Sequence, residues 1–345
     1  MFRKLFNAPK DHPKVQTEKI GVLLGNLGTP GATDYWSVRK YLKEFLSDRR
    51  VIDYSPWVWQ PILSLILLRR PFSSGASYKE IWNSEKNESP LLTITREQTK
   101  KLRLMCKSRL RKHVIVDFCM RYGEPSTEKV IGKMKEQGCN KILFFPLYPQ
   151  YASPTTATAN DQVFRSLMKL NWQPALRTVP PYFDNENYIE SICNSIKKVY
   201  KKTKMKPDHL VLSYHGVPER YLLSGDPYHC QCQKTTRLVM EKLGWLKSDL
   251  TTAFQSKFGP EKWVGPATSE LVSDLAKGGK KKIAIVAPSF ASDCLETLEE
   301  ICGEIRESFL SAGGKDFVYI PCLNDQDSHL ETIFQITETE LAGWI

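Results

Sequence analysis

The chain has 345 residues, of which 41% are hydrophobic and 25% are charged, and its formal net charge at pH 7 is +11. This length is too great for one typical core, so it predicts two domains of about 150 residues each, with an otherwise ordinary globular composition. The positive charge favours acidic partners, but the lysines are scattered along surface segments without an arginine–aromatic motif, which argues against nucleic-acid binding.

The N-terminal segment, MFRKLFNAPKDHPK, lacks the apolar stretch that a signal peptide needs. Nine cysteines form an odd number without regular spacing, so we expect free thiols in a reducing cytoplasm. The longest apolar run, residues 56–68, is too short to span a bilayer and contains Pro61. The sequence therefore predicts a cytoplasmic chain that is not an integral membrane protein.

Short β-branched runs alternate with longer helical patterns along the chain, which predicts α/β layers with parallel sheets. Six strands are expected at residues 20–25, 114–120, 141–147, 210–214, 282–288 and 317–321. Two weaker candidates lie at residues 175–179 and 251–256. Continuous apolar strands of this kind are buried on both faces, as parallel sheets require.

Three further segments organise the chain. GNLGTPG, residues 25–31, has glycines at a spacing of three and three, so it predicts a tight strand-to-helix turn lining a cleft and not a dinucleotide site. PQYASPTTATAND, residues 149–161, is small and polar and is the predicted domain junction. A last helix is expected at about residues 327–341, packed on either domain.

His215 directly follows one predicted strand, and SFASDCLETLEEICGEI, residues 289–305, directly follows another. Ligands bind at the carboxyl ends of strands in open parallel sheets, so these two segments should share one rim. On an α-helix, Asp293, Glu296 and Glu300 would place three carboxylates on one face. A solvated acidic stripe is the alternative, although a helix that starts at the rim of a sheet faces a cleft.

A histidine opposite carboxylates suits two kinds of chemistry, although a lone histidine at a strand end is more often structural. Imidazole and carboxylate form a nitrogen and oxygen set for a loosely bound divalent metal ion. The same groups provide a base with carboxylates that carry protons away. The residues therefore indicate a site for a metal ion, for proton transfer, or for both.

Five segments in collinear order, between about residues 20 and 323, resemble signature segments of the ferrochelatase family. They are NLGTP, FPLYPQYASPTTAT, SYHGVPERYLLSGDPY, FQSKFGPEKWVGPAT and PSFASDCLETLEEI. The resemblance implies two Rossmann-like domains, each a four-stranded parallel sheet flanked by helices, with a porphyrin in the cleft between them. We expect domains at residues 1–155 and 156–324, and a C-terminal helix, about residues 325–345, that packs back on the first domain.

The resemblance also implies an activity and its residues. Family members insert Fe²⁺ into protoporphyrin IX, the last step of haem biosynthesis, so iron and the porphyrin are the expected partners and no cofactor is required. The catalytic and metal-handling pair falls on His215 and Glu296. Asp293 and Glu300 would continue the acidic face as a proton or metal relay, on a helix that carries a π-helical distortion in this family. Matching porphyrin-binding positions, for which packing is the alternative, are Arg121, Tyr122 and Trp263.

PWVWQPILSLILLRR, residues 56–70, supplies the apolar surface that a porphyrin needs. We expect Trp59, Ile62 and Ile66 to bind the macrocycle as part of a hydrophobic lip. The arginine pair at its end is placed to meet propionates or anionic lipid, so peripheral contact with the inner membrane is a further expectation. A buried core helix is the alternative, because about 12 apolar residues also suit a core.

The chain departs from animal members of the family at its cysteines. Animal members ligate a [2Fe–2S] cluster through one internal cysteine, where this chain has Ser153, and three in a C-terminal extension, whereas this sequence ends at Ile345. Cys294 stands where animal members carry a histidine. Cys230 and Cys232 are the candidate cluster ligands, but they offer two of the four thiolates needed, so we expect no cluster.

The sequence therefore predicts a cytoplasmic ferrochelatase of bacterial type. A chelatase for coproporphyrin or another tetrapyrrole is the alternative among enzymes, because sequence spacing does not distinguish the porphyrin. A non-catalytic porphyrin or haem carrier is the alternative from another class, although a carrier has no need for a base opposite an acidic row. The oligomeric state and the iron donor stay open.

Overall fold

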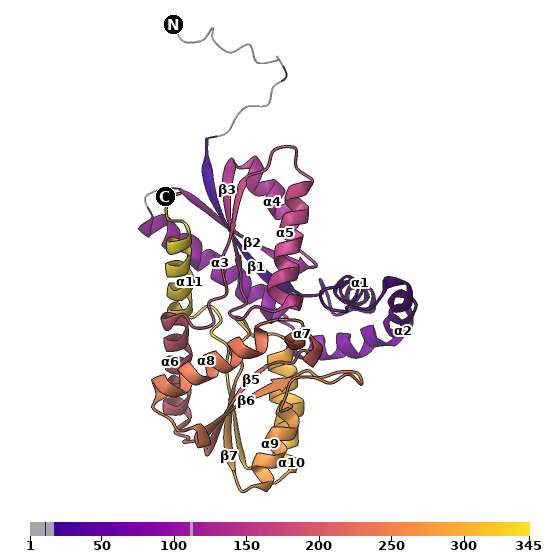
Figure 1. Ribbon diagram of the computed structural model, residues 1–345, viewed down its shortest axis with the longest axis vertical. Coiled ribbons are helices and arrows are strands. Elements are labelled where there is room, and N and C mark those ends of the chain that lie inside the picture. Colours follow the sequence, from indigo (N-terminus) through magenta and orange to yellow (C-terminus); the bar gives the residue numbers. More distant parts are fainter. Residues whose placement is uncertain (1–10, 12–16, 111–112) are drawn as a thin grey trace.

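Two four-stranded parallel sheets form the framework of the molecule, one above the other along its long axis (Figure 1). The structure is a computed structural model and describes residue 11, residues 17–110 and residues 113–345. The N-terminal segment that argued against a signal peptide therefore lies almost entirely outside the described residues.

All eight predicted strands are present. The first sheet has the order β2-β1-β3-β4 and contains β1 (Lys19–Gly28), β2 (Val114–Tyr122), β3 (Cys139–Pro146) and β4 (Ala175–Thr178). The second has the order β6-β5-β7-β8 and contains β5 (His209–His215), β6 (Leu250–Gln255), β7 (Lys282–Val286) and β8 (Asp316–Ile320). Every pairing is parallel, which confirms the predicted fold class.

Both faces of the central strands are buried, as the continuous apolar runs predicted, whereas the edge strands β4 and β8 are partly exposed. Leu23 and Leu24 are adjacent in β1 and point to opposite faces, where they join two different clusters of buried apolar side chains. The larger cluster also takes in Leu212 of β5 and Phe334 near the C-terminus, so it continues from the first sheet to the second. The two sheets are thereby held together by a shared core.

Helices connect the strands and range from one turn to the 26 residues of α2. Those before β5 are α1 (Tyr35–Leu46), α2 (Pro56–Ile81), α3 (Pro90–Arg109), α4 (Thr127–Glu136), the π-helix η1 (Ser153–Ala157), α5 (Thr158–Met168) and α6 (Glu186–Thr203). Those after β5 are α7 (Glu219–Leu223), α8 (Tyr228–Leu243), the 3₁₀ helix η2 (Lys247–Asp249), α9 (Thr268–Lys277), the π-helix η3 (Glu296–Ile305), α10 (Arg306–Ser311) and α11 (Asp327–Glu340).

The first sheet extends further along the chain than the predicted boundary after residue 155. β4 pairs with β3, so the chain belongs to the first sheet as far as Thr178. The small polar segment at residues 149–161 instead contains η1 and the first turn of α5. Small residues predicted a loop there, but the pairing of a later strand decides where the sheet ends. The predicted last helix is present as α11, and it contacts both α3 and α6.

The turn after β1 is tight, as its glycines predicted. Gly28 has a φ of +107°, and a Cβ there would lie 1.9 Å from the carbonyl oxygen of Tyr122 on the neighbouring strand. Asp34 then caps α1 by accepting hydrogen bonds from the backbone N–H groups of Trp36 and Ser37. The turn therefore directs α1 away from the sheet.

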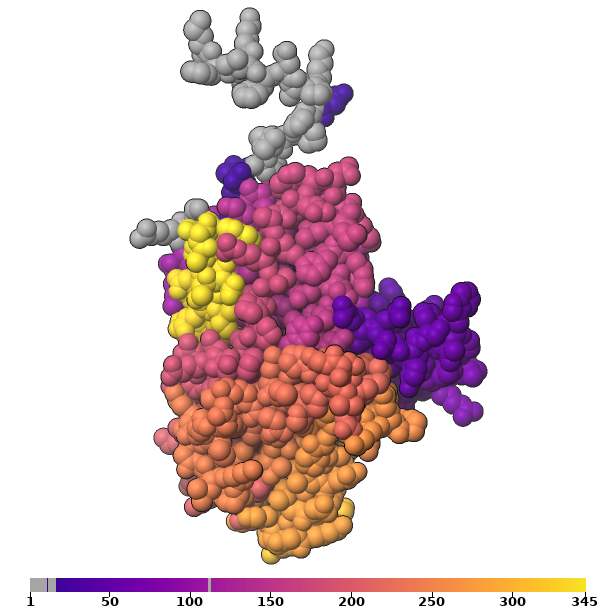
Figure 2. All heavy atoms as spheres, in the orientation of Figure 1, coloured from indigo at the N-terminus to yellow at the C-terminus, as the bar shows by residue number. Residues whose placement is uncertain are grey.

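α1 and α2 project from the side of the molecule, and Figure 2 shows this indigo segment standing out from the body. α2 has Pro56 in its first turn and continues through Pro61 and Pro71. Pro61 was therefore not the interruption that the sequence suggested. Among the described residues, no helix is both long and apolar enough to cross a membrane.

Candidate active site

His215 ends β5 at the carboxyl edge of the second sheet and is half-buried. Its Nδ1 lies 2.7 Å from the carbonyl oxygen of Gly216. A carbonyl oxygen only accepts hydrogen bonds, so Nδ1 carries a proton, and in the neutral ring Nε2 then holds the lone pair. A ring held in this way can offer Nε2 to a metal ion or to a proton.

Gly216 leaves room for an aromatic ring beside this histidine. A Cβ at Gly216 would lie 2.8 Å from the carbonyl oxygen of Gln255 and 3.0 Å from Cε3 of Trp263. The Trp263 ring therefore packs directly against the residue that follows His215. Trp263 is half-buried and lies edge-to-face with Phe258, with 4.9 Å between the ring centroids. The structure thus brings two predicted site residues, His215 and Trp263, together.

The acidic helix η3 begins at the same rim. Gln255 is the register partner of His215, and its side-chain amide donates to the carbonyl oxygen of Glu296 at 2.7 Å and to the Glu300 carboxylate at 3.1 Å. Ser256 donates to Glu300 from its backbone N–H at 2.7 Å and from its hydroxyl at 2.5 Å. The end of β6 therefore fixes the helix next to His215, on the shared rim that the sequence predicted.

Glu300 is held as a buried carboxyl group with an altered pKa. Burial raises the pKa of Glu300 above its usual value, although the hydrogen bonds from Ser256 and Gln255 and the charge of His215 act in the opposite direction. Gln255, the register partner of His215, donates to the Glu300 carboxylate, so both groups lie beside the end of β6. A carboxyl group with a raised pKa is better able to hold a proton near neutral pH.

Glu296 lies close to α1 and α2, the helices between β1 and β2 of the first sheet. Tyr41 of α1 and Tyr78 of α2 are both buried, which raises the pKa of each phenol, and the nearby Glu296 carboxylate raises it further. Burial likewise raises the pKa of the neighbouring Cys294 thiol well above its usual value, so this thiol stays protonated. Glu296 thus lies where η3 meets α2, close to two phenols and a thiol that stay protonated.

Asp293 does not share the face of Glu296 and Glu300, contrary to the α-helical prediction. It precedes η3, which is a π-helix whose hydrogen bonds join residues five apart. The buried Asp293 carboxylate accepts hydrogen bonds from the Tyr319 hydroxyl at 2.6 Å and from the Asn324 amide at 2.6 Å. These partners lie in β8 and the loop after it. A role for Asp293 in a relay stays a prediction.

Arg121 and Tyr122, two predicted porphyrin contacts, have their polar ends engaged elsewhere. Both donate to the carboxylate of Asp48, Tyr122 at 2.8 Å, and Thr158 donates to the same oxygen. The Arg121 and Asp48 side chains are only 8% and 7% exposed, and Tyr122 is fully buried. Burial opposes ionisation of Asp48, but the hydrogen bonds and the Arg121 charge lower its pKa. Direct porphyrin contact by these residues stays a prediction.

The predicted lip residues lie on α2. Trp57 and Leu65 are 91% and 69% exposed, which contradicts the alternative of a buried core helix. Ile62 is exposed and Ile66 half-exposed, so both are available to a ligand. Trp59 is half-buried and donates from Nε1 to the carbonyl oxygen of Leu46 at 2.6 Å, so part of its role is to fix α2 against α1.

Cys230 and Cys232 lie in the first turns of α8, and all nine cysteines are free. Residues two apart on a helix point to different sides. Cys230 is exposed, whereas Cys232 is fully buried, and burial raises the pKa of the Cys232 thiol well above its usual value. The two sulfur atoms therefore do not face a common ligand position. In the described part of the chain, no three His, Cys, Asp or Glu side chains form a group that could hold a metal ion.

Several residues of this site escaped the sequence prediction. Gln255 and Ser256 end a predicted strand beside His215, so the rule that ligands gather at strand ends could have found them. Tyr41 and Tyr78 come from α1 and α2, between β1 and β2 of the first sheet, and no spacing in the sequence links them to Glu296. Their nearness to Glu296 depends on how these helices pack against the second sheet and η3.

Comparisons with known proteins bear on this arrangement. The family model described as Ferrochelatase matches residues 19–341. Proteins named Ferrochelatase from Rhodobacter capsulatus and Agrobacterium fabrum are 59% and 51% identical to the chain. The first similarity covers 99% of this chain and 98% of the relative, and the second covers 100% of both.

Solved structures resemble the fold. SirB from Bacillus subtilis with Fe³⁺ has a TM-score of 0.56 at 11% identity, covering 94% of this chain and 97% of that chain. The sirohydrochlorin chelatase SirB from Bacillus subtilis subspecies spizizenii in complex with cobalt has a TM-score of 0.54, also at 11% identity, over 93% and 95%. At this level of identity the likeness concerns the arrangement of sheets and helices.

Proposed function

The chain belongs to the ferrochelatase family, and on that premise we propose that it inserts Fe²⁺ into protoporphyrin IX to give protohaem, with His215 and Glu296 handling the metal ion and the pyrrole protons. The iron is a substrate of this metal-insertion lyase and not a resident cofactor. One observation carries the residue assignment. Gln255 is the register partner of His215, and its side-chain amide donates to the backbone carbonyl of Glu296 at the start of η3, so both residues lie at the same edge of the sheet.

The chemistry requires two pyrrolic protons to leave as the metal ion enters. His215 suits this step because Nδ1 is held by the Gly216 carbonyl and Nε2 keeps its lone pair. Glu296 adds a carboxylate at the start of η3, close to the buried Tyr41 and Tyr78. Glu300, with its raised pKa, is the group best suited to pass a proton along η3.

The apolar part of α2 supports binding of a flat hydrophobic macrocycle. Ile62 and Ile66 present aliphatic surface on α2, a helix that also contacts η3. A porphyrin against this surface would gain binding energy remote from the metal, which can be used to distort the ring toward the reacting geometry. The exposed Trp57 also favours peripheral contact of a cytoplasmic protein with a lipid surface.

One assay tests the proposed reaction. Purified protein is incubated anaerobically with Fe²⁺ and protoporphyrin IX, and in parallel with coproporphyrin III, and haem formation is followed by absorbance. We expect kcat/KM to be higher for protoporphyrin IX. Preferential metallation of coproporphyrin would overturn the substrate, and tight porphyrin binding without any metallation would favour a carrier. The names of the relatives do not favour either alternative.

The double variant Ile62→Ser with Ile66→Ser is expected to raise KM for the porphyrin by at least about tenfold, with a smaller effect on kcat, because burial of two such side chains is worth about 3–5 kcal/mol at most. The measurement is steady-state kinetics of metal insertion. Met168→Ser with Trp172→Ser removes two exposed apolar side chains elsewhere and is the matched control. An unchanged KM would show that α2 does not bind the porphyrin.

Replacing Cys230, Cys232 or both with Ser is expected to leave metal insertion unchanged, because an exposed and a buried thiol on different sides of α8 cannot share a cluster. Iron and acid-labile sulfide are measured in anaerobically isolated protein. We expect less than about one sulfide per chain, against the two of a [2Fe–2S] centre. Stoichiometric sulfide that disappears in the Cys230 variant would contradict this proposal.

A further inference from the structure

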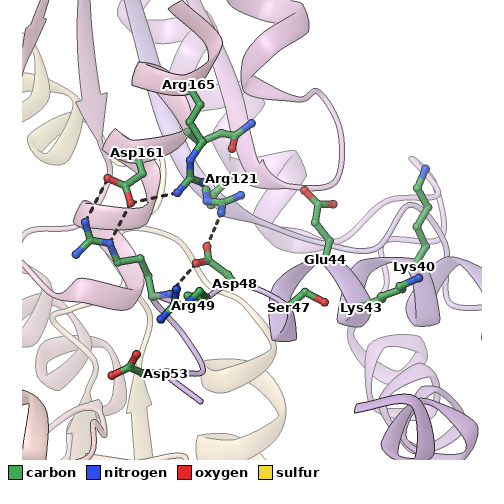
Figure 3. A pocket seen from close by; sticks show the side chains of 12 residues that line it. Lys40, Lys43, Glu44, Ser47, Asp48, Arg49, Asp53, Arg121, Asp161 and Arg165 are labelled. Carbon is green, nitrogen blue, oxygen red and sulfur yellow. Dashed lines mark hydrogen bonds and ion pairs between the residues drawn. The ribbon is translucent and has the colours of Figure 1, made fainter. Parts of the chain in front are cut away.

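A pocket of about 890 Å³ lies outside the rim that carries His215. It opens between the end of α1, the connector at residues 47–53 and the start of α5, with one residue of β2 at its base (Figure 3). Its lining residues are Lys40, Lys43, Glu44, Ser47, Asp48, Arg49, Arg50, Asp53, Arg121, Asp161, Gln162 and Arg165. Of the predicted site residues, Arg121 alone lines it.

The charge of this pocket is unbalanced. Six of the lining side chains are basic and four are acidic, an excess of two positive charges. Among the described residues, no ion pair involves Lys40, Lys43 or Arg49, and all three are exposed. These three cations are therefore available to a ligand.

The acidic side chains of the pocket are already engaged. Asp161 is shared by Arg50 at 3.0 Å and Arg165 at 3.5 Å. Glu44 accepts a hydrogen bond from the backbone N–H of Gly123 at 3.1 Å. The other two are paired with arginines, in the pairs Asp48–Arg121 and Asp53–Arg220. Among the described residues, Glu44 is thus the one pocket carboxylate without a basic partner, and the pocket keeps its excess of positive charge.

The base of the pocket is fixed before any ligand arrives. Arg121 and Asp48 are more than nine-tenths buried and are held by Tyr122 and Thr158. Asp48 also accepts from the backbone N–H of Arg50 at 2.8 Å, which fixes the connector that carries Arg49. A fixed base and connector reduce the conformational entropy lost on binding an anion, because only the exposed side chains remain to be ordered.

We propose that this pocket binds a ligand that carries two phosphate groups. Figure 3 shows Lys40 and Lys43 on one side of the pocket and Arg49 nearer its middle, beside Asp48, so two anionic groups can be met at once. Guanidinium groups bind phosphate oxygens in pairs, and lysine ammonium groups add point charges. The pocket volume accommodates a larger ligand than a single phosphate ion.

Two sources can supply this chemistry. One is a soluble diphosphate, and the other is the headgroup of a diphosphoryl lipid. The lipid is a candidate because the connector leads directly into α2, where Trp57 is 91% exposed in the first turn. The inference concerns phosphate binding and does not depend on the identity of the porphyrin.

The first arm of the test measures binding of inorganic pyrophosphate and of orthophosphate by titration calorimetry at low ionic strength. We expect pyrophosphate to bind at least about tenfold more tightly than orthophosphate, and the double variant Lys40→Glu with Lys43→Glu to lose at least about tenfold in pyrophosphate affinity. Arg49→Glu is a second, independent variant with the same expected direction. Lys201→Glu with Lys202→Glu, two exposed lysines on α6, is the matched control and should keep wild-type affinity.

The second arm measures sedimentation with phosphatidylcholine vesicles that contain cardiolipin. If the ligand is a lipid headgroup, retention falls in the Lys40/Lys43 variant and pyrophosphate displaces the protein from the vesicles. If the ligand is soluble, retention is the same in wild type and variant while pyrophosphate affinity falls. Absence of pyrophosphate binding together with unchanged retention would overturn the proposal. An equal loss in the Lys201/Lys202 control would overturn it too, because the effect would then be one of net charge.

Discussion

The His215→Ala variant is expected to lose metal insertion almost completely while its porphyrin affinity stays within about tenfold of wild type. The physical reason is that the imidazole acts on the metal ion and the protons and contributes little apolar contact area to the macrocycle. Loss of a positioned acid–base group alone costs about 10²–10⁴ in rate, and His215 would also lose its role as a metal ligand. The measurements are single-turnover metallation and equilibrium porphyrin binding by fluorescence.

His229→Ala is the matched control for this variant. His229 is partly buried in α8 and stacks on Phe254 with 5.5 Å between ring centroids, so its removal tests the loss of a histidine from the same unit. We expect the His229 variant to retain most of its activity. Turnover near the wild-type rate in His215→Ala would show that the metal ion and protons are handled elsewhere.

The Glu296→Gln variant is expected to lose at least about a hundredfold in kcat, the lower end of what a positioned proton-transfer group contributes. Glutamine keeps the size of the side chain and removes its charge, so the comparison isolates the carboxylate. The change also leaves the hydrogen bond from Gln255 intact, because that bond is accepted by the backbone carbonyl of Glu296. A loss confined to kcat would identify an interaction made in the transition state.

Two further carboxyl variants separate rate from stability. Glu300→Gln and Asp293→Asn are expected to cost less in kcat than Glu296→Gln. Asp293→Asn should instead lower the free energy of unfolding by about 1–3 kcal/mol, because its buried carboxylate accepts from Tyr319 and Asn324. The two readouts are kcat and the denaturant midpoint. If Glu296→Gln, Glu300→Gln and Asp293→Asn all left kcat unchanged, the carboxylates of this segment would form only a solvated acidic surface.

The central strands were predictable from the sequence because burial on both faces requires a nearly continuous apolar run. The edge strands β4 and β6 contain polar residues, and they accordingly gave the weaker signals. His215 at the end of such a run could be placed on the rim, since parallel strands all end at one edge. The glycine turn after β1 followed from local backbone conformation, because Gly28 adopts a φ of +107°.

The remaining features depended on contacts between segments far apart in the chain. The sheet boundary was misplaced because β4 pairs with β3, and pairing is invisible in a run of four partly exposed residues. Asp293 does not share the acidic face with Glu296 and Glu300, because its carboxylate accepts hydrogen bonds from β8 and from the loop after it. Likewise, Arg121 and Tyr122 turn to a carboxylate 73 and 74 residues away.

Local sequence therefore determined which residues form strands and which histidine stands at the rim, because these follow from burial and backbone preference within one segment. Only the tertiary structure decided which carboxylates lie near His215, which serve as buried anchors, and which cations of the described residues form no ion pair. The physical reason is that a charged side chain takes its role from the groups that surround it after folding. Asp48 and Glu296 are both carboxylates, yet one is bound by Arg121 and the other faces Tyr41 and Tyr78.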